Sequence, residues 1–159
     1  MAVAALVTWL VTAGLGFTML YSWISKGGLQ AARGGTEQSS RFAPGLVFGH
    51  FLLAAAGLIL WIVYVITDTE ALTWVAFVFL IAIAVLGDLL FLRWGSGLAS
   101  SAVESGLPKP VVYTHGVFSA TTIVLVLLTA LGVGESGPAC RTGRAVARLP
   151  WRALAGPVP

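Results

Sequence analysis

The sequence predicts an all-α, polytopic membrane protein, a four-transmembrane-helix bundle with an internal hairpin repeat. Of its 159 residues, 58% are hydrophobic and only 9% are charged, whereas roughly a quarter of the residues in soluble domains are charged. The chain contains four apolar runs of about 20 residues, each long enough to cross a hydrocarbon core of roughly 30 Å. At this length the four helices form a single domain and leave no room for a soluble catalytic domain.

The apolar runs are bounded by polar residues, Gly or Pro. This places the expected helices at residues 3–23, 46–66, 72–92 and 111–133. The first run lacks a positively charged n-region and is longer than a usual signal h-region, so we expect a retained helix rather than a cleaved signal peptide.

The basic residues separate the two faces of the expected bundle. The loops at 24–45 and 93–110 carry five of the nine basic residues, whereas the turn between the second and third helices carries none. Those five are Lys26, Arg33, Arg41, Arg93 and Lys109. By the positive-inside rule we expect a multi-pass protein of the cell membrane with both loops cytoplasmic and both termini outside. The other four basic residues lie in the C-terminal segment and argue against this orientation. They are Arg141, Arg144, Arg148 and Arg152.

The transmembrane domain is expected over residues 1–134, and a different composition follows it. Residues 135–159 are rich in Gly, Pro, Ala and Arg without an apolar period, which predicts a disordered tail. The sole cysteine, Cys140, excludes an intrachain disulfide. The expected partner is the lipid bilayer, with a larger membrane complex or a homodimer as alternatives. The sequence has no aromatic-interleaved basic surface of the kind that binds nucleic acid.

The chain contains a similar hairpin twice. An L-G-x6-W pattern ends the first helix at residues 15–23 and the third helix at residues 86–94, without gaps. A proline followed by a histidine opens the second helix at Pro44 and His50, and the fourth at Pro110 and His115. Two hairpins that run the same way pack about a pseudo-twofold axis along the membrane normal. His50 and His115 would then be equivalent positions.

His50 and His115 are the only histidines, and each lies about five residues inside an apolar run. Because the two runs are parallel, we expect the imidazoles at the same depth, where a ligand on the axis would meet both. Haem b fits this arrangement best, since its iron takes one axial nitrogen from each side. The alternative is that each histidine only hydrogen-bonds a hydroxyl or a carbonyl group on the next helix.

Small residues accompany both histidines. Gly49 and Gly116 adjoin them, and small side chains follow on the same helical faces at four and seven residues, namely Ala54, Gly57, Ser119 and Thr122. Such residues would let a macrocycle approach the backbone. The alternative interpretation is ordinary small-residue helix packing in lipid.

The segments GHFLLAAAGLILW and THGVFSATT, which contain the two histidines, resemble bis-His haem b proteins of the cytochrome b561 type. The resemblance implies histidines on parallel helices of a four-helix core that hold haem. Members of that family usually carry two haems on four histidines, whereas this chain has two histidines, enough for one haem. The overall pattern is also similar to small uncharacterised bacterial four-helix integral membrane proteins, which implies an architecture and no activity.

Asp88 is the one acidic residue inside an expected helix, near the depth of both histidines. A carboxylate in the apolar layer costs a few kcal/mol unless it is neutral or paired. It could accept the Nδ1 proton of a ligating histidine. It could instead complete a two-His, one-carboxylate metal site, pair with Arg93, or stay protonated.

No catalytic motif of a classical enzyme occurs in the sequence. The favoured hypothesis is one haem b between His50 and His115, for electron transfer or haem handling. The alternatives are a non-catalytic accessory subunit of a membrane complex and a small proton-coupled carrier that uses Asp88. Tryptophans near the span ends predict interfacial belts at Trp9, Trp23, Trp74 and Trp94, with Trp61 deeper as core filling.

Overall fold

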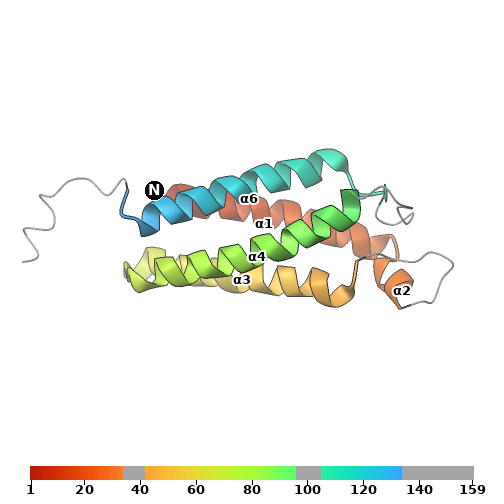
Figure 1. The fold of residues 1–159 in the computed structure, drawn as a ribbon, viewed down its shortest axis with the longest axis horizontal. Helices are drawn as coiled ribbons and strands as arrows, with labels where there is room; N and C mark the ends of the chain where they lie inside the picture. Colours follow the sequence, from red (N-terminus) through yellow and green to blue (C-terminus); the bar gives the residue numbers. More distant parts are fainter. Residues whose placement is uncertain (34–41, 96–104, 134–159) are drawn as a thin grey trace, which may run out of the picture.

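A computed structural model describes residues 1–33, 42–95 and 105–133 of the chain. Within these residues the fold is all-α, as predicted, and four long helices lie side by side (Figure 1). These are α1 (Ala2–Ser25), α3 (Pro44–Thr67), α4 (Ala71–Gly95) and α6 (Lys109–Ala130). All four are long and apolar enough to cross a membrane, which confirms the predicted class. The predicted disorder of 135–159 lies outside the described residues, as do Arg41 and Cys140.

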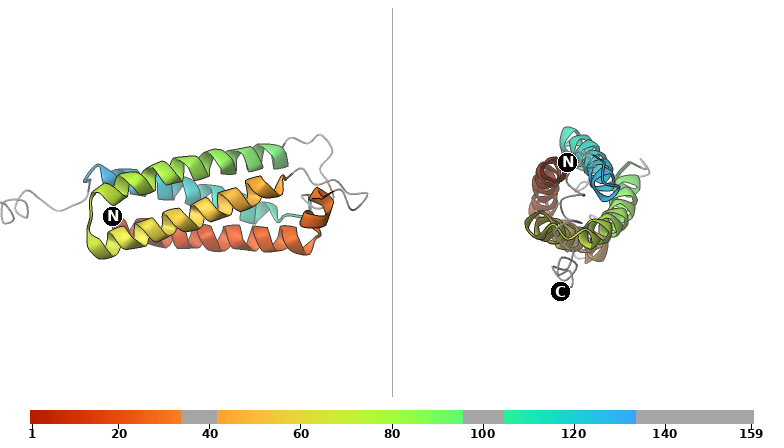
Figure 2. Two further views of the ribbon diagram at one scale, coloured as in Figure 1. Left: turned by 90° about the horizontal axis from the view of Figure 1, so that it is seen from below. Right: turned by 90° about the vertical axis from the view of Figure 1, so that its left-hand side faces the viewer.

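The four long helices form a ring in the order α1, α6, α4, α3, seen end-on in Figure 2. The most extensive contacts join α1 to α6 and α3 to α4, while α1 with α3 and α4 with α6 touch less. The close pairs therefore join one half of the repeat to the other, and the helices of each hairpin are the looser pairs. The two parallel pairs, α1 with α4 and α3 with α6, lie on the diagonals of the ring.

Helix ends follow the residues that favour them. Pro44 and Pro110 occupy the first turns of α3 and α6, where a missing N–H costs no hydrogen bond. Asp68 ends α3 in the left-handed conformation with φ of 53°. Gly132, with φ of +70°, forms a Schellman cap in which the Val133 N–H donates to the Leu128 carbonyl at 2.9 Å. This cap ends the last helix at residue 130, three residues before the predicted end.

The loop expected at 24–45 contains a short helix that sequence patterning missed. α2 (Gly28–Ala32) packs against the last turn of α1, and the indole ring of Trp23 fills the space beside it. A Cβ at Gly28 would lie only 2.3 Å from the Trp23 ring. Glycine is therefore required for this contact.

The tryptophans divide differently from the predicted belts. Trp9 and Trp23 are 3% and 2% exposed, so both are core residues rather than interfacial anchors. Trp74 is 45% exposed, as a belt residue should be. Trp61 is fully buried, which confirms its expected place in the core, and its Nε1 donates to the Ala2 carbonyl at 3.2 Å. The two core clusters lie around Trp9 and Trp61 at one end of the bundle and around Trp23 at the other.

Candidate functional site: two facing histidines in an apolar cavity

His50 projects from α3 toward the centre of the bundle and contacts α4. Its Nδ1 lies 3.0 Å from the backbone carbonyl oxygen of Ile83. Because a carbonyl oxygen only accepts hydrogen bonds, Nδ1 carries the proton and Nε2 keeps its lone pair. The imidazole is thus held in the tautomer that can ligate a metal through Nε2.

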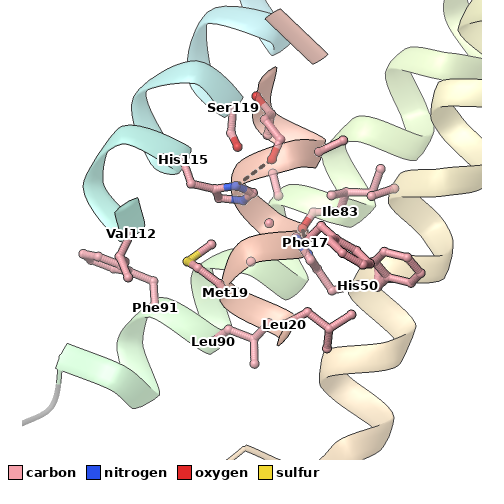
Figure 3. Close-up of a pocket in the computed structure, with 18 of the residues that line it drawn as sticks. Phe17, Met19, Leu20, His50, Ile83, Leu90, Phe91, Val112, His115 and Ser119 are labelled. Carbon is pink, nitrogen blue, oxygen red and sulfur yellow. Dashed lines mark hydrogen bonds between the residues drawn. The ribbon is translucent and has the colours of Figure 1, made fainter. Parts of the chain in front are cut away.

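His115 repeats this arrangement on the opposite side of the bundle. Its Nδ1 lies 3.0 Å from the carbonyl oxygen of Thr12 on α1, the dashed line in Figure 3. Thr12 and Ile83 are 71 residues apart, the same offset that relates Gly16 to Gly87 and Trp23 to Trp94 in the L-G-x6-W patterns. The hydrogen-bond acceptors of the two histidines therefore follow the sequence repeat.

Each histidine reaches its carbonyl because a glycine lies one helical turn further along. A helical Cβ leans toward the preceding turn and covers the carbonyl of residue i−4. Gly16 and Gly87 stand at that position for Thr12 and Ile83. A Cβ at Gly16 would lie 3.1 Å from His115 Cε1, and one at Gly87 would lie 3.2 Å from His50 Cε1. The two glycines thus leave the space in which the rings sit.

The two imidazoles face each other across the bundle axis. Their ring centroids are 6.4 Å apart and the ring planes are inclined by 57°. Each histidine lies six residues from the first residue of its helix, or roughly 9 Å from the same end of the bundle at 1.5 Å per residue. The predicted common depth is therefore confirmed.

A large apolar cavity surrounds the rings, with a volume of about 1090 Å³. This exceeds slightly the range of roughly 300–1,000 Å³ that is typical of cofactor and ligand pockets. All four long helices contribute to its lining, and the polar groups in the lining are few. Figure 3 shows Met19, Leu20, Leu90 and Phe91 on its walls near the histidines.

The small residues predicted to surround a ligand fall in different places. Gly116 lines the cavity and Gly49 does not, and a Cβ at either would meet no atom within 4 Å. Ala54, Ser119 and Thr122 line the cavity as expected. Gly57 instead faces Trp9, since a Cβ there would lie 3.0 Å from Trp9 Cζ2. Its small size makes room for a core tryptophan.

Asp88 lies in the cavity wall but contacts neither histidine. Both Nδ1 atoms are bound to backbone carbonyls, so of the alternatives for Asp88 the structure does not show the one in which it accepts an Nδ1 proton. Among the described residues no three His, Cys, Asp or Glu side chains gather as a ligand set. No ion pair to Arg93 accompanies Asp88, although Arg93 has a partner of its own.

The positions that sequence reasoning missed as site residues are Thr12, Gly16, Ile83 and Gly87. Two of them, the glycines, were visible in the repeated L-G pair. Their role in making room for the imidazoles could not be predicted from the sequence. Only the packing of α1 against α6 and of α3 against α4 brings the glycines beneath the rings.

Comparisons with known proteins add no further information about this site. A scan against protein-family models, a search of curated proteins and a search of solved structures each found no match to the chain.

Proposed function

We propose that this chain binds one haem b between His50 and His115, near the end of the bundle that bears the two long loops. The observation that carries the proposal is the pair of facing imidazoles, each with Nδ1 on a backbone carbonyl and Nε2 free. An imidazole nitrogen binds a transition metal at about 2 Å, so two rings on opposite sides of one ion have centroids roughly 6 Å apart. The 6.4 Å separation agrees with that value.

The donor set favours a macrocycle over a bare metal ion. A structural or catalytic zinc site needs three or four protein ligands, and the described residues offer no group of three. Two imidazoles complete the coordination of an iron whose other four positions are filled by porphyrin nitrogens. The apolar lining and the size of the cavity suit a flat hydrophobic ligand.

When bound, haem b supplies a one-electron couple whose potential depends on its axial ligands and surroundings. The residues of this chain orient the ligating nitrogens through the Thr12 and Ile83 carbonyls, and the cavity walls exclude water. If His50 and His115 both held the haem, the site would favour electron transfer or haem handling over the binding of small molecules at the iron. By the positive-inside rule, the haem would lie toward the cytoplasmic face, because Lys26, Arg33, Arg93 and Lys109 are at this end.

The test is a reduced-minus-oxidised visible spectrum of the full chain, purified in detergent from haem-replete cells. We expect a sharp low-spin b-type α band that disappears in both His50→Ala and His115→Ala. Thr121→Ala is the matched control, because its hydroxyl is exposed and bonds only within α6, to the Val117 carbonyl at 2.9 Å. Circular dichroism and gel filtration verify that each variant is folded.

A featureless spectrum from folded, haem-supplied wild-type protein would overturn the proposal and leave the accessory-subunit role first. If haem is present, its transfer to apomyoglobin separates the two uses. Fast transfer indicates haem handling, and slow transfer together with a reversible couple indicates electron transfer.

A further inference from the structure

Among the residues that line the cavity, Asp88 is the only aspartate, glutamate, lysine or arginine, and the two histidines line it as well. Its side chain is exposed on α4, and the described part of the chain gives it no hydrogen bond and no ion pair. A carboxylate at this depth of a membrane helix is costly unless it is neutral or has a partner. No lysine or arginine lines the cavity, and the Nδ1 atom of each lining histidine lies on a backbone carbonyl rather than on Asp88. We therefore expect a cationic partner of the carboxylate from outside the cavity lining.

Three aromatic rings line the same cavity as this carboxylate and contact one another. Phe91 is one helical turn after Asp88 on the same face of α4, and it meets Trp94 and, across the gap to α6, Tyr113. The ring centroids are 5.8 Å apart for Phe91 and Trp94, 6.2 Å for Phe91 and Tyr113, and 5.9 Å for Trp94 and Tyr113. All three rings line the cavity. The faces of such rings attract cations, most strongly where water is excluded.

The cavity reaches the outer surface of the bundle at this place. Phe91, Tyr113 and Val117 line the cavity and are 44%, 57% and 66% exposed. α4 and α6 form one of the looser helix pairs, and a Cβ at the neighbouring Gly116 would meet no atom within 4 Å. In a bilayer this surface faces lipid. A molecule that enters here must therefore be soluble in the membrane.

We propose that the mouth of the cavity between α4 and α6, formed by Asp88, Phe91, Trp94 and Tyr113, binds a lipophilic organic cation. The carboxylate neutralises the positive charge, the rings stabilise it through their faces, and the apolar walls take up its hydrophobic part. The repeat does not provide a second such mouth. At the 71-residue offset, Phe17 stands for Asp88 and Leu20 stands for Phe91.

This site uses neither imidazole, although it lines the same cavity as the proposed haem site. The experiment is isothermal titration of the detergent-purified full chain with tetraphenylphosphonium, a membrane-soluble cation. We expect saturable binding that weakens at least tenfold in Asp88→Asn, stays close to wild type in Asp88→Glu, and weakens a few-fold in Tyr113→Leu. Asp68→Asn is the control for the loss of one negative charge. Asn tolerates the left-handed conformation at that position, so binding should be unchanged.

Uncharged triphenylphosphine oxide separates charge recognition from simple partitioning into the cavity or the detergent. It should bind weakly and to the same degree in wild type and Asp88→Asn. Equal affinity of wild type and Asp88→Asn for tetraphenylphosphonium, with both proteins folded by circular dichroism, would overturn the proposal. Repeating the titration with His50→Ala, which removes the proposed haem ligand, shows whether the cation site survives a failure of haem binding.

Discussion

His50 and His115 occupy equivalent positions in the two halves of the bundle, but the walls beside them differ. On the His115 side, α6 meets α1 through hydroxyl groups, and Thr122 Oγ1 donates to Thr8 Oγ1 at 3.0 Å. On the His50 side, the equivalent positions are apolar. Gly57 follows His50 by seven residues, as Thr122 follows His115, and Phe79 stands 71 residues after Thr8. The contacts between imidazole, carbonyl and glycine are the same in both halves.

The hydrogen bond that both histidines make depends on backbone atoms of the neighbouring helix. A carbonyl oxygen is present at every residue, so Thr12 can differ from Ile83 without loss of the hydrogen bond. The glycine one turn later cannot be exchanged in the same way, since any Cβ there lies beside the ring. The two halves can therefore differ in sequence around Gly16 and Gly87, but not at these two positions.

The largest expected effect tests this equivalence directly. Gly16→Val and Gly87→Val should each displace the facing imidazole, because even a Cβ would lie 3.1 or 3.2 Å from its Cε1. We expect haem content, measured as the pyridine haemochrome per protein, to fall at least tenfold in both. Gly45→Val is the control, since Gly45 does not line the cavity and a Cβ there has nothing within 4 Å. Loss in one variant alone would mean that the halves are not equivalent.

The next effect concerns stability in the His50 half. Gly57→Ala places a Cβ 3.0 Å from Trp9 Cζ2 and 3.4 Å from Phe79 Cβ, and overpacking of this kind costs about 1–3 kcal/mol. The free energy of unfolding, measured in mixed micelles of increasing denaturing detergent, should fall by this amount. Gly49→Ala should leave it unchanged. A neutral Gly57→Ala would show that Trp9 can move aside.

A third effect concerns the charge that only one half carries. Asp88→Asn removes a negative charge that favours the oxidised state, so the midpoint potential of the bound haem should rise. Two unit charges 10 Å apart at an effective dielectric of 20 interact by about 1.7 kcal/mol. A rise of the order of 70 mV is therefore expected, because 59 mV corresponds to a tenfold change for one electron. Phe17→Leu, at the equivalent position, should change it little. An unchanged midpoint potential in Asp88→Asn would show that the charge of Asp88 does not act on the haem.

The smallest effect concerns the hydroxyl pair of the His115 half. Thr122→Val removes the donor to Thr8, and such hydrogen bonds between membrane helices contribute about 0.6 kcal/mol on average. The same unfolding measurement should detect a loss of that size. Thr121→Val, whose exposed hydroxyl bonds within its own helix, should cost less. Equal losses would show that the contact with α1 adds no stability.

The sequence by itself determined the fold class, the number of long helices and their boundaries to within a few residues. Hydropathy, Pro44 and Pro110 at helix starts, and the acidic turn at 68–70 were sufficient, because these signals act within a single helix or turn. The matched depth of His50 and His115 also followed from sequence, because helix length sets depth in a membrane. The short helix α2 was missed, since it is stabilised by contact with Trp23 rather than by its own pattern.

Tertiary structure alone decided which residues surround the histidines. The closest helix pairs join the two hairpins rather than the helices within each. The tight turn at 68–70 favours the α3–α4 pair, but no local pattern specifies the whole arrangement with α1 against α6. It brings Gly16 and Gly87 beneath the rings, provides the Thr12 and Ile83 carbonyls as acceptors, and buries Trp9 and Trp23. It also leaves Asp88 exposed in the cavity wall, without a hydrogen bond to either imidazole. The physical reason is that side-chain contacts between helices depend on the rotation and pairing of each helix, which apolar sequences of low amphipathicity leave open.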